Sequence, residues 1–101
     1  MAINRMRPIH PGEILREDYL VPLDLSAHAL AMELRVPAPR INDVVREKRS
    51  ITVDTALRLA RYFNTTAQFW MNLQSSYDLK VAERELGSKI ENEVRPMQMA
   101  A

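Results

Sequence analysis

A three-residue connection, Arg35-Val36-Pro37, separates two short stretches of sequence whose apolar residues recur at helical spacing. The prolines at 37 and 39 cannot lie inside a helix that continues from the first stretch, but they suit the first turn of a new helix. Two short helices joined by so few residues must cross steeply. This connection therefore constrains the arrangement of the middle of the chain more than any other feature.

The residues around the connection fit the packing rule of a helix-turn-helix over the window 27–46. The apolar positions where two such helices meet are filled by Leu30, Ala31, Leu34, Val36, Ile41 and Val44. Arg35 occupies the position where glycine is usual, because the turn residue has a positive φ. A bulky residue in that conformation costs about 1 kcal/mol. We therefore expect either a left-handed Arg35 or a turn that the prolines bend differently.

Caps and prolines divide the rest of the chain into further helices. A first helix is predicted from Pro11 until Pro22 closes it. Ser26 and Thr52 are the predicted N-caps of the second and fourth helices, and the third begins near Pro37 or Ala38. The residues expected to face inward on the fourth helix are Val53, Ala56, Leu57, Ala60 and Phe63.

The C-terminal third is predicted to form two more helices. Thr65-Thr66-Ala67-Gln68 fits a capping box that opens the fifth, Gly87 is predicted to end it, and Ser88 to begin a short sixth helix. A stripe with helical spacing is either a dimer seam or a surface that folds back on its own domain; it consists of Leu79, Ala82, Leu86, Ile90 and Val94. The predicted division is an N-terminal arm (1–9), a helix-turn-helix domain (10–86), and a C-terminal helix with a frayed tail (87–101).

The composition excludes several classes of protein. With 101 residues the chain has the length of one domain. It has no cysteine and two histidines, which excludes disulfides and thiolate metal sites and leaves too few histidines for a metal centre. We expect no metal and no cofactor. No apolar run suggests a membrane span or a secretory signal, so a cytoplasmic protein that does not contact membranes is expected. No nucleophile, base and orienting group cluster together, so an enzyme is not expected.

The charge is unevenly distributed along the chain. Residues 37–63 carry six basic and three acidic side chains, whereas residues 64–101 carry four basic and five acidic ones. Such an asymmetry alone fits a solvated surface. Placed on a helix-turn-helix, it favours double-stranded DNA as the partner.

The third helix is the predicted recognition helix. Arginine can pair with guanine and asparagine with adenine in the major groove, and the N-terminal part of the helix enters the groove. The residues predicted to face DNA on this helix are Ala38, Pro39, Arg40, Asn42, Asp43 and Arg46. Lys48, Arg49, Ser50 and Thr52 after the helix, and Ser26 at the start of the second helix, are predicted to contact phosphates.

Other candidates have simpler interpretations. Trp70 and its aromatic neighbours have the spacing of core residues, which is favoured over a stacking platform for single strands. Glu13, Glu17 and Asp18 could form an acidic patch for a basic partner, but a solvated first helix is the favoured interpretation.

Several motifs together identify a family. They are His10-Pro11-Gly12-Glu13-Ile14-Leu15, Leu25-Ser26, Val36-Pro37, Arg40-Ile41-Asn42, Lys48-Arg49-Ser50-Ile51-Thr52, and the stretch from Asp54 to Phe63 through Phe69-Trp70-Met71-Asn72-Leu73-Gln74. With these motifs the chain resembles Xre/Cro-type helix-turn-helix proteins, and within them the HigA antitoxin family, also called VapI-like. The resemblance covers about residues 9–82, and Arg35 departs from the family's usual glycine.

The resemblance implies an all-α, lambda-repressor-like domain of five helices, to which the sequence adds the short C-terminal helix. It implies a homodimer that binds a palindromic operator and represses its own operon. It also implies a partner toxin of the HigB type, a RelE-like ribonuclease that cleaves messenger RNA and that the antitoxin neutralises. A stand-alone Xre-family regulator without a toxin, or a protein-interaction module that no longer binds DNA, would have the same fold.

Overall fold

The computed structural model describes residues 7–98. Most of the predicted N-terminal arm (1–6) and the last residues of the predicted tail (99–101) lie outside the described residues. Within the described range the chain is helical, with no β-strand, as predicted. No helix in this range combines the length and the apolar character needed to cross a bilayer.

The first helical segment is continuous but changes its bonding pattern along its length. It consists of α1 (Pro11–Ile14), the π-helical segment η1 (Leu15–Leu20) and α2 (Val21–Leu23). The prediction that Pro22 closes this helix is wrong, because the helix ends at Asp24 in the left-handed conformation. In η1 the Val21 N–H bonds to the Arg16 carbonyl five residues back. This wider turn, just before Pro22, accommodates the proline's ring and its missing N–H.

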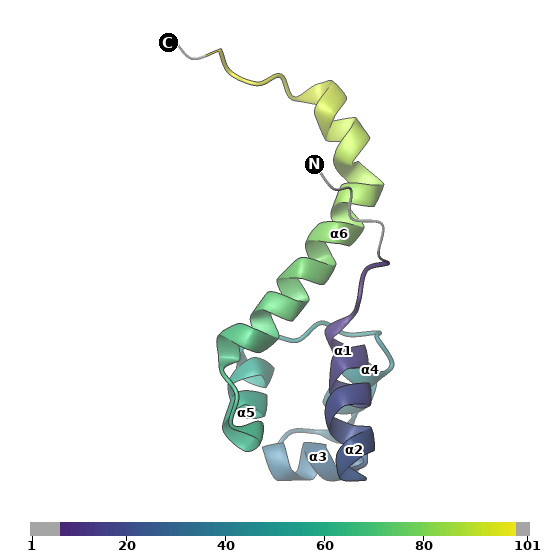
Figure 1. Ribbon diagram of the computed structural model, residues 1–101, viewed down its shortest axis with the longest axis vertical. Coiled ribbons are helices and arrows are strands. Elements are labelled where there is room, and N and C mark those ends of the chain that lie inside the picture. The colour runs from purple at the N-terminus through teal and green to yellow at the C-terminus, as the bar shows by residue number, and fades with distance from the viewer. Residues whose placement is uncertain (1–6, 99–101) are drawn as a thin grey trace.

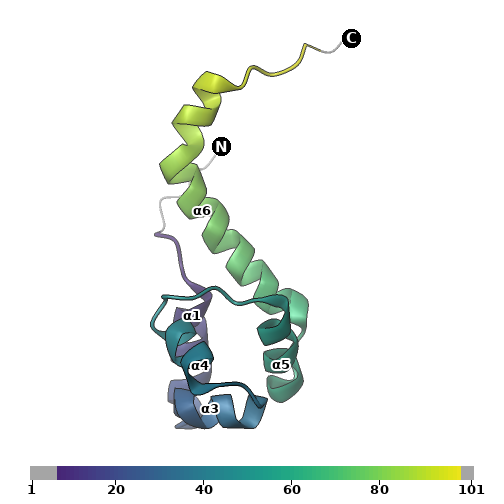
Figure 2. The same ribbon diagram turned by 180° about the vertical axis from the view of Figure 1, so that it is seen from behind.

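The remaining helices are α3 (Ala27–Leu34), α4 (Ala38–Val45), α5 (Val53–Phe63) and α6 (Ala67–Glu93). The predicted caps are confirmed: the side chains of Ser26 and Thr52 accept the N–H groups of Ala29 and Thr55. In α6 the cap is Thr66, which accepts the Phe69 N–H. The predicted capping box from Thr65 to Gln68 is therefore wrong by one residue, and the Gln68 amide instead donates to Asn72. Helices α1 and α4 lie together on one side of the bundle, α5 lies on the other, and α3 closes one end (Figures 1 and 2).

The core lies between these helices and contains every apolar residue of the predicted helix-turn-helix packing rule. Its buried members are Leu15, Leu20, Leu30, Ala31, Leu34, Val36, Ile41, Val44, Ile51, Ala56, Leu59 and Trp70. Trp70 is fully buried and its indole N–H donates to Thr65 Oγ1 over 2.8 Å, so its interpretation as a core residue is confirmed. The aromatic rings of Tyr19 and Phe63 pack beside it.

The predicted inward face of α5 is partly wrong. Ala56, Ala60 and Phe63 do pack in the core, but Val53 and Leu57 are exposed, and Leu59 is fully buried instead. Because α5 packs against both α3 and α6, its buried face is rotated toward Thr55 and Leu59. The exposed Leu57 lies in a shallow groove between α3 and α5, beside Glu33 and Tyr62.

The prediction of a separate sixth helix is also wrong. Helix α6 continues through Gly87 and Ser88 to Glu93. A β-carbon on Gly87 would meet no atom within 4 Å, so no packing requires its flexibility there. The pattern Ser88-x-x-Glu91 occurs inside the helix, where the backbone N–H groups already have partners.

The distal part of α6 projects from the bundle (Figures 1 and 2). The described chain measures 55 × 25 × 24 Å and has a radius of gyration of 17.2 Å, against about 13 Å for a compact domain of this length. Leu79, Leu86, Ile90 and Val94 are all exposed. The alternative that the C-terminal stripe folds back on its own domain is therefore wrong for these residues.

Candidate nucleic-acid interface

The turn between α3 and α4 has the geometry that a helix-turn-helix requires. Arg35 has φ 61° and ψ 43°, the left-handed conformation that glycine usually supplies. The Val36 N–H bonds to the Ala31 carbonyl, and the Val36 side chain is buried. Pro37 caps α4 and Pro39 lies in its first turn. Of the two expected geometries, the left-handed Arg35 is the one found.

Helix α4 has one face in the core and one toward solvent. Ile41 and Val44 are fully buried, and Ala38 packs against the core. The predicted polar residues lie on the other sides: Arg40, Asn42 and Asp43 are half-buried, and Pro39 and Arg46 are exposed. This placement gives Ala38 less access to a ligand than the other predicted residues of α4.

The loop after α4 brings the predicted phosphate-binding residues to the same region. Lys48, Arg49, Ser50 and Thr52 are exposed. The Lys48 N–H bonds to the Asp43 carbonyl over 2.8 Å, and the Arg49 guanidinium lies 3.5 Å from the Asp43 carboxylate. A shallow hollow between α4 and the start of α5 is lined by Arg40, Arg49, Ser50, Thr52, Asp54 and Thr55. Ser26 is exposed, but its hydroxyl oxygen already accepts the Ala29 N–H.

An ion-pair chain that was not predicted crosses this region. Arg40 Nη1 lies 2.5 Å from Asp54 Oδ2, and Arg58 Nε donates to the same oxygen over 2.9 Å. Arg58 Nη1 donates to the Leu34 carbonyl at the end of α3. The hydrogen bonds from Arg58 and then Arg40 hold the pKa of Asp54 below its ordinary value. Asp54 and Arg58 are an i,i+4 pair on α5, but Arg40 lies 14 residues from Asp54 on another helix and Leu34 lies 24 residues from Arg58, so helical spacing does not indicate these two contacts.

The first helix contacts the C-terminal end of α4. Gly12 is buried against the Val44 carbonyl, and Arg16 Nη1 donates to the Val45 carbonyl over 2.5 Å, which caps the end of α4. Arg16 Nη2 also lies 3.3 Å from the carboxylate of Glu47, whose φ is 64°. Pro11 and Gly12 open the first helix as predicted, but their spacing does not indicate the close contact of Gly12 with α4.

The other end of the loop is fixed by α6. Gln74 is buried, its Oε1 accepts the Ile51 N–H over 2.7 Å, and its Nε2 donates to Asp78. A buried amide that receives a backbone N–H holds the loop in one position. The loop that carries Lys48 and Arg49 is thus attached both to α4 and to α6.

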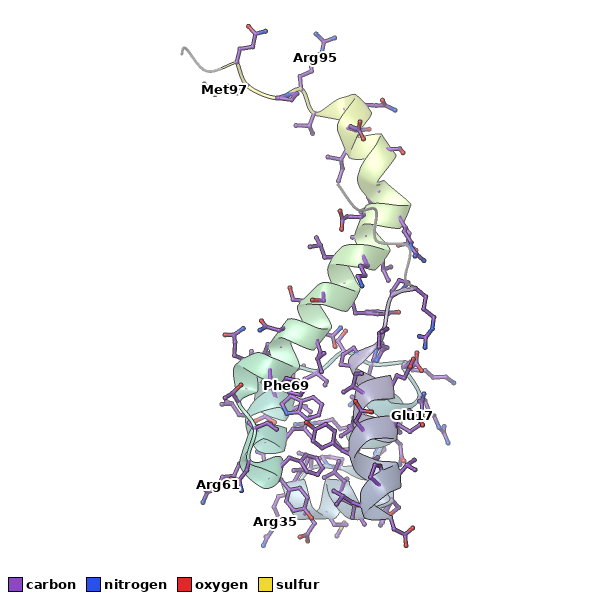
Figure 3. All side chains as sticks on the ribbon, in the orientation of Figure 1. Glu17, Arg35, Arg61, Phe69, Arg95 and Met97 are labelled. Atoms are coloured by element: carbon purple, nitrogen blue, oxygen red, sulfur yellow. The ribbon has the colours of Figure 1, made fainter. Side chains whose placement is uncertain are left out.

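The acidic residues of the first helix do not form an open patch. Glu13 receives two hydrogen bonds of 2.8 Å from Arg7, and Glu17 pairs with Arg16. Asp18 is exposed. This favours the interpretation of a solvated helix surface. In Figure 3, Glu17 lies on the opposite side of the bundle from Arg61.

Helix α3 lies across the end of α4 (Figure 2), the residue between them is left-handed, and a basic loop follows α4. These features define a helix-turn-helix protein. Comparison with known proteins agrees: the Helix-turn-helix family matches residues 15–70. Virulence-associated protein I of Dichelobacter nodosus is 63% identical over 82 residues, which cover 81% of this chain and 76% of that protein.

Solved structures place the whole fold in this family. The structure described as Pseudomonas aeruginosa antitoxin HigA with the higBA promoter is 56% identical, has a TM-score of 0.89, and covers 91% of this chain and all of that chain. The structure described as antitoxin GraA in complex with its operator is 43% identical with a TM-score of 0.90, over 98% of this chain and all of that chain. The similarity thus extends through α6, beyond the range of the sequence resemblance. The chain belongs to the HigA antitoxin family of helix-turn-helix proteins.

Proposed function

We propose that this protein is a sequence-specific DNA-binding repressor and the antitoxin of a type II toxin–antitoxin pair, and that it autoregulates its own operon. The observation that carries the proposal is α4, which is fixed on the core through Ile41 and Val44 beside an exposed basic loop. Its short, anchored shape suits a recognition helix in the major groove. The similar HigA and GraA structures, described with a promoter and an operator, support this use of the fold.

Base reading is assigned to the start of α4 and phosphate binding to its surroundings. Arg40 and Asn42 are the side chains with donors that suit guanine and adenine, and Pro39 and Asp43 lie beside them. Arg46, Lys48 and Arg49 supply charge, while Ser50, Thr52 and Ser26 supply hydroxyls and N–H groups at helix starts. Ala38 contributes at most a backbone contact, because its side chain packs against the core.

A homodimer is proposed as the active form. Two copies of α4 would enter successive major grooves about 34 Å apart on a palindromic operator. The exposed Leu79, Leu86 and Ile90 and the half-buried Ala82 form a stripe on distal α6, and the exposed Val94 follows directly after the helix. This stripe supports a second copy as its occupant. Repression follows when the bound dimer blocks RNA polymerase in the cytoplasm.

The toxin part of the proposal rests on the family. The expected partner is a HigB-like toxin of the RelE family, encoded beside this gene, which cleaves messenger RNA and is neutralised in the complex. Co-expression of the adjacent gene with a tagged antitoxin should give a stable complex and relieve growth arrest. If the neighbouring gene encodes no such partner, the stand-alone regulator is the better description.

A mobility-shift titration tests the DNA-binding part. The probe is the DNA upstream of the protein's own gene, with a shuffled duplex of equal length as control. We expect a preferred complex on the upstream DNA whose affinity falls steeply with salt. If six phosphates are neutralised, the slope of log K against log salt is about −5. Equal binding to both duplexes, or none, would favour a protein-interaction module instead.

A further inference from the structure

The side chain of Arg40, the strongest candidate for base reading, is not free to rotate in solvent. Its Nη1 lies 2.5 Å from Asp54 Oδ2, and 32% of the Arg40 side chain is exposed. Asp54 is itself held by Arg58 Nε over 2.9 Å, and Arg58 is tied to the Leu34 carbonyl. The position of Arg40 is therefore set by α3 and α5 as well as by its own helix.

Stability alone explains this arrangement poorly. Asp54 is 54% exposed and Arg58 is 40% exposed, and ion pairs with this much solvent contact contribute about 0–1 kcal/mol. A carboxylate beside a DNA-facing arginine also opposes the attraction of phosphates. An acidic residue at position 54 thus weakens general affinity for DNA. Neither protein stability nor DNA affinity explains its presence beside Arg40.

The ion pair with Asp54 fixes the orientation of the Arg40 guanidinium. An arginine has five N–H donors in one plane, and a carboxylate that accepts from Nη1 leaves the others pointing in fixed directions. A guanidinium in a fixed orientation matches one arrangement of base acceptors, whereas a mobile guanidinium can bind any nearby phosphate oxygen. Discrimination between sequences depends on the difference between these two kinds of binding.

We propose that Asp54 is a positioning residue that sets sequence specificity: it holds Arg40 so that this side chain reads a base rather than binding phosphates indiscriminately. The inference rests on the proposed operator binding. Asp54 acts through Arg40, and Arg58 holds Asp54 in place. The alternative is that Asp54 merely stabilises the start of α5, where it lies in the first turn.

The test measures the ratio of affinities for two labelled duplexes, the upstream DNA of the gene and a shuffled sequence of equal length, at one salt concentration. Asp54→Asn is expected to bind the shuffled duplex more tightly and to lower the ratio by about tenfold, the scale of one base-reading pair. Asp18→Asn is the matched control, because it removes the same charge from an exposed site on the first helix. That control should leave the ratio unchanged.

The decisive comparison adds Arg40→Ala. If Asp54 acts through Arg40, then Asp54→Asn lowers the ratio in the parent but not in the Arg40→Ala background. A ratio that stays within twofold of the parent in Asp54→Asn, or that falls equally in both backgrounds, would overturn the inference and leave the repressor proposal intact. A parent protein with no preference for the upstream duplex would overturn both.

A second measurement reads the arginine without DNA. Nitrogen-15 relaxation of the Arg40 Nε–H group should show an ordered side chain in the parent and in Asp54→Glu, and a mobile one in Asp54→Asn. A purely structural Asp54 would change the melting temperature and leave Arg40 order the same. Equal order in the parent and Asp54→Asn would contradict the positioning role.

Discussion

Gly12 packs against the main-chain carbonyl of Val44 so closely that a β-carbon at position 12 would lie 1.8 Å from the Val44 oxygen. The contact joins the start of the first helix to the last turn of the recognition helix. Only a residue without a side chain allows this approach. The glycine that lies in the first turn of α1 thus also sets the distance between α1 and α4.

Gly12→Ala should therefore destabilise the protein. Because the neighbour is backbone rather than a flexible side chain, α1 and α4 must separate, which costs about 1–3 kcal/mol. Urea unfolding followed by circular dichroism measures the loss. Gly87→Ala is the matched control; it lies in open space within α6 and should stabilise the protein by about 0.5–1 kcal/mol. Equal effects of the two substitutions would show that the Gly12 contact is not close in solution.

The His10 cap makes stability depend on pH. His10 is buried, its Nδ1 accepts the Gly12 N–H over 2.9 Å, and its ring packs edge-on against Tyr77. Burial lowers the pKa of His10 below its ordinary value of 6.5. The unfolded chain then binds the proton more readily, so the unfolding free energy falls as the pH drops below about 7, until it reaches the native pKa.

Thermal unfolding between pH 7.5 and 5.0 checks this. The parent should lose melting temperature across the window, whereas His10→Asn, which keeps a capping side chain, should be flatter. His28→Asn changes an exposed histidine and should follow the parent. Parallel curves for the parent and His10→Asn would show that His10 is not the group responsible.

Replacing Arg35, the residue in the turn between α3 and α4, with glycine is expected to stabilise the protein. Arg35 is exposed and has φ 61°, so Arg35→Gly relieves a strained backbone and should raise stability by up to about 1 kcal/mol. Arg35→Ala removes the same side chain but keeps the strain, and should give no such gain. Melting temperatures of the three proteins compare these effects. A stability gain in Arg35→Ala equal to that in Arg35→Gly would assign it to the side chain rather than to φ.

The α6 stripe predicts the dimer interface. Leu86→Glu with Ile90→Glu should yield a monomer in sedimentation velocity with unchanged helical content, because both side chains are exposed in the single chain. Affinity for operator DNA should fall with the loss of the second half-site contact. Lys89→Glu, on the same turn, makes the same net charge change and should remain dimeric. A double variant that stays dimeric would move the interface elsewhere, for example to the groove beside Leu57.

The helix-turn-helix was predictable because its signals are local. Prolines at 37 and 39, the caps Ser26 and Thr52, and the spacing of Leu30 to Val44 each act over a few residues, and the structure confirms them. The predictions were wrong where contacts with a neighbouring helix determine the end of a helix or its buried face. Pro22 lies inside a helix because a π-helical turn precedes it. Leu57 faces solvent because the opposite side of α5 packs against α3 and α6.

In the candidate site, too, local features were predictable and long-range contacts were not. Exposure of Pro39, Arg46 and the basic loop follows from the pattern of α4, but the support from Gly12, Arg16 and Gln74 depends on contacts over more than 20 residues. The pairing of Arg40 with Asp54 spans only 14 residues, but it too joins two separate helices. No period or motif in the sequence encodes such contacts, because they arise only when separate helices meet.

The most direct test of the repressor assignment is the affinity of Arg40→Ala and Asn42→Ala for the gene's own upstream DNA, measured by fluorescence anisotropy at matched salt. We expect each variant to lose about 1–3 kcal/mol of binding to that duplex, roughly 5- to 150-fold, while melting at the parent's temperature and retaining its binding to a shuffled duplex within a few fold. Variants that bind the upstream DNA as tightly as the parent would show that α4 does not read the operator through these side chains.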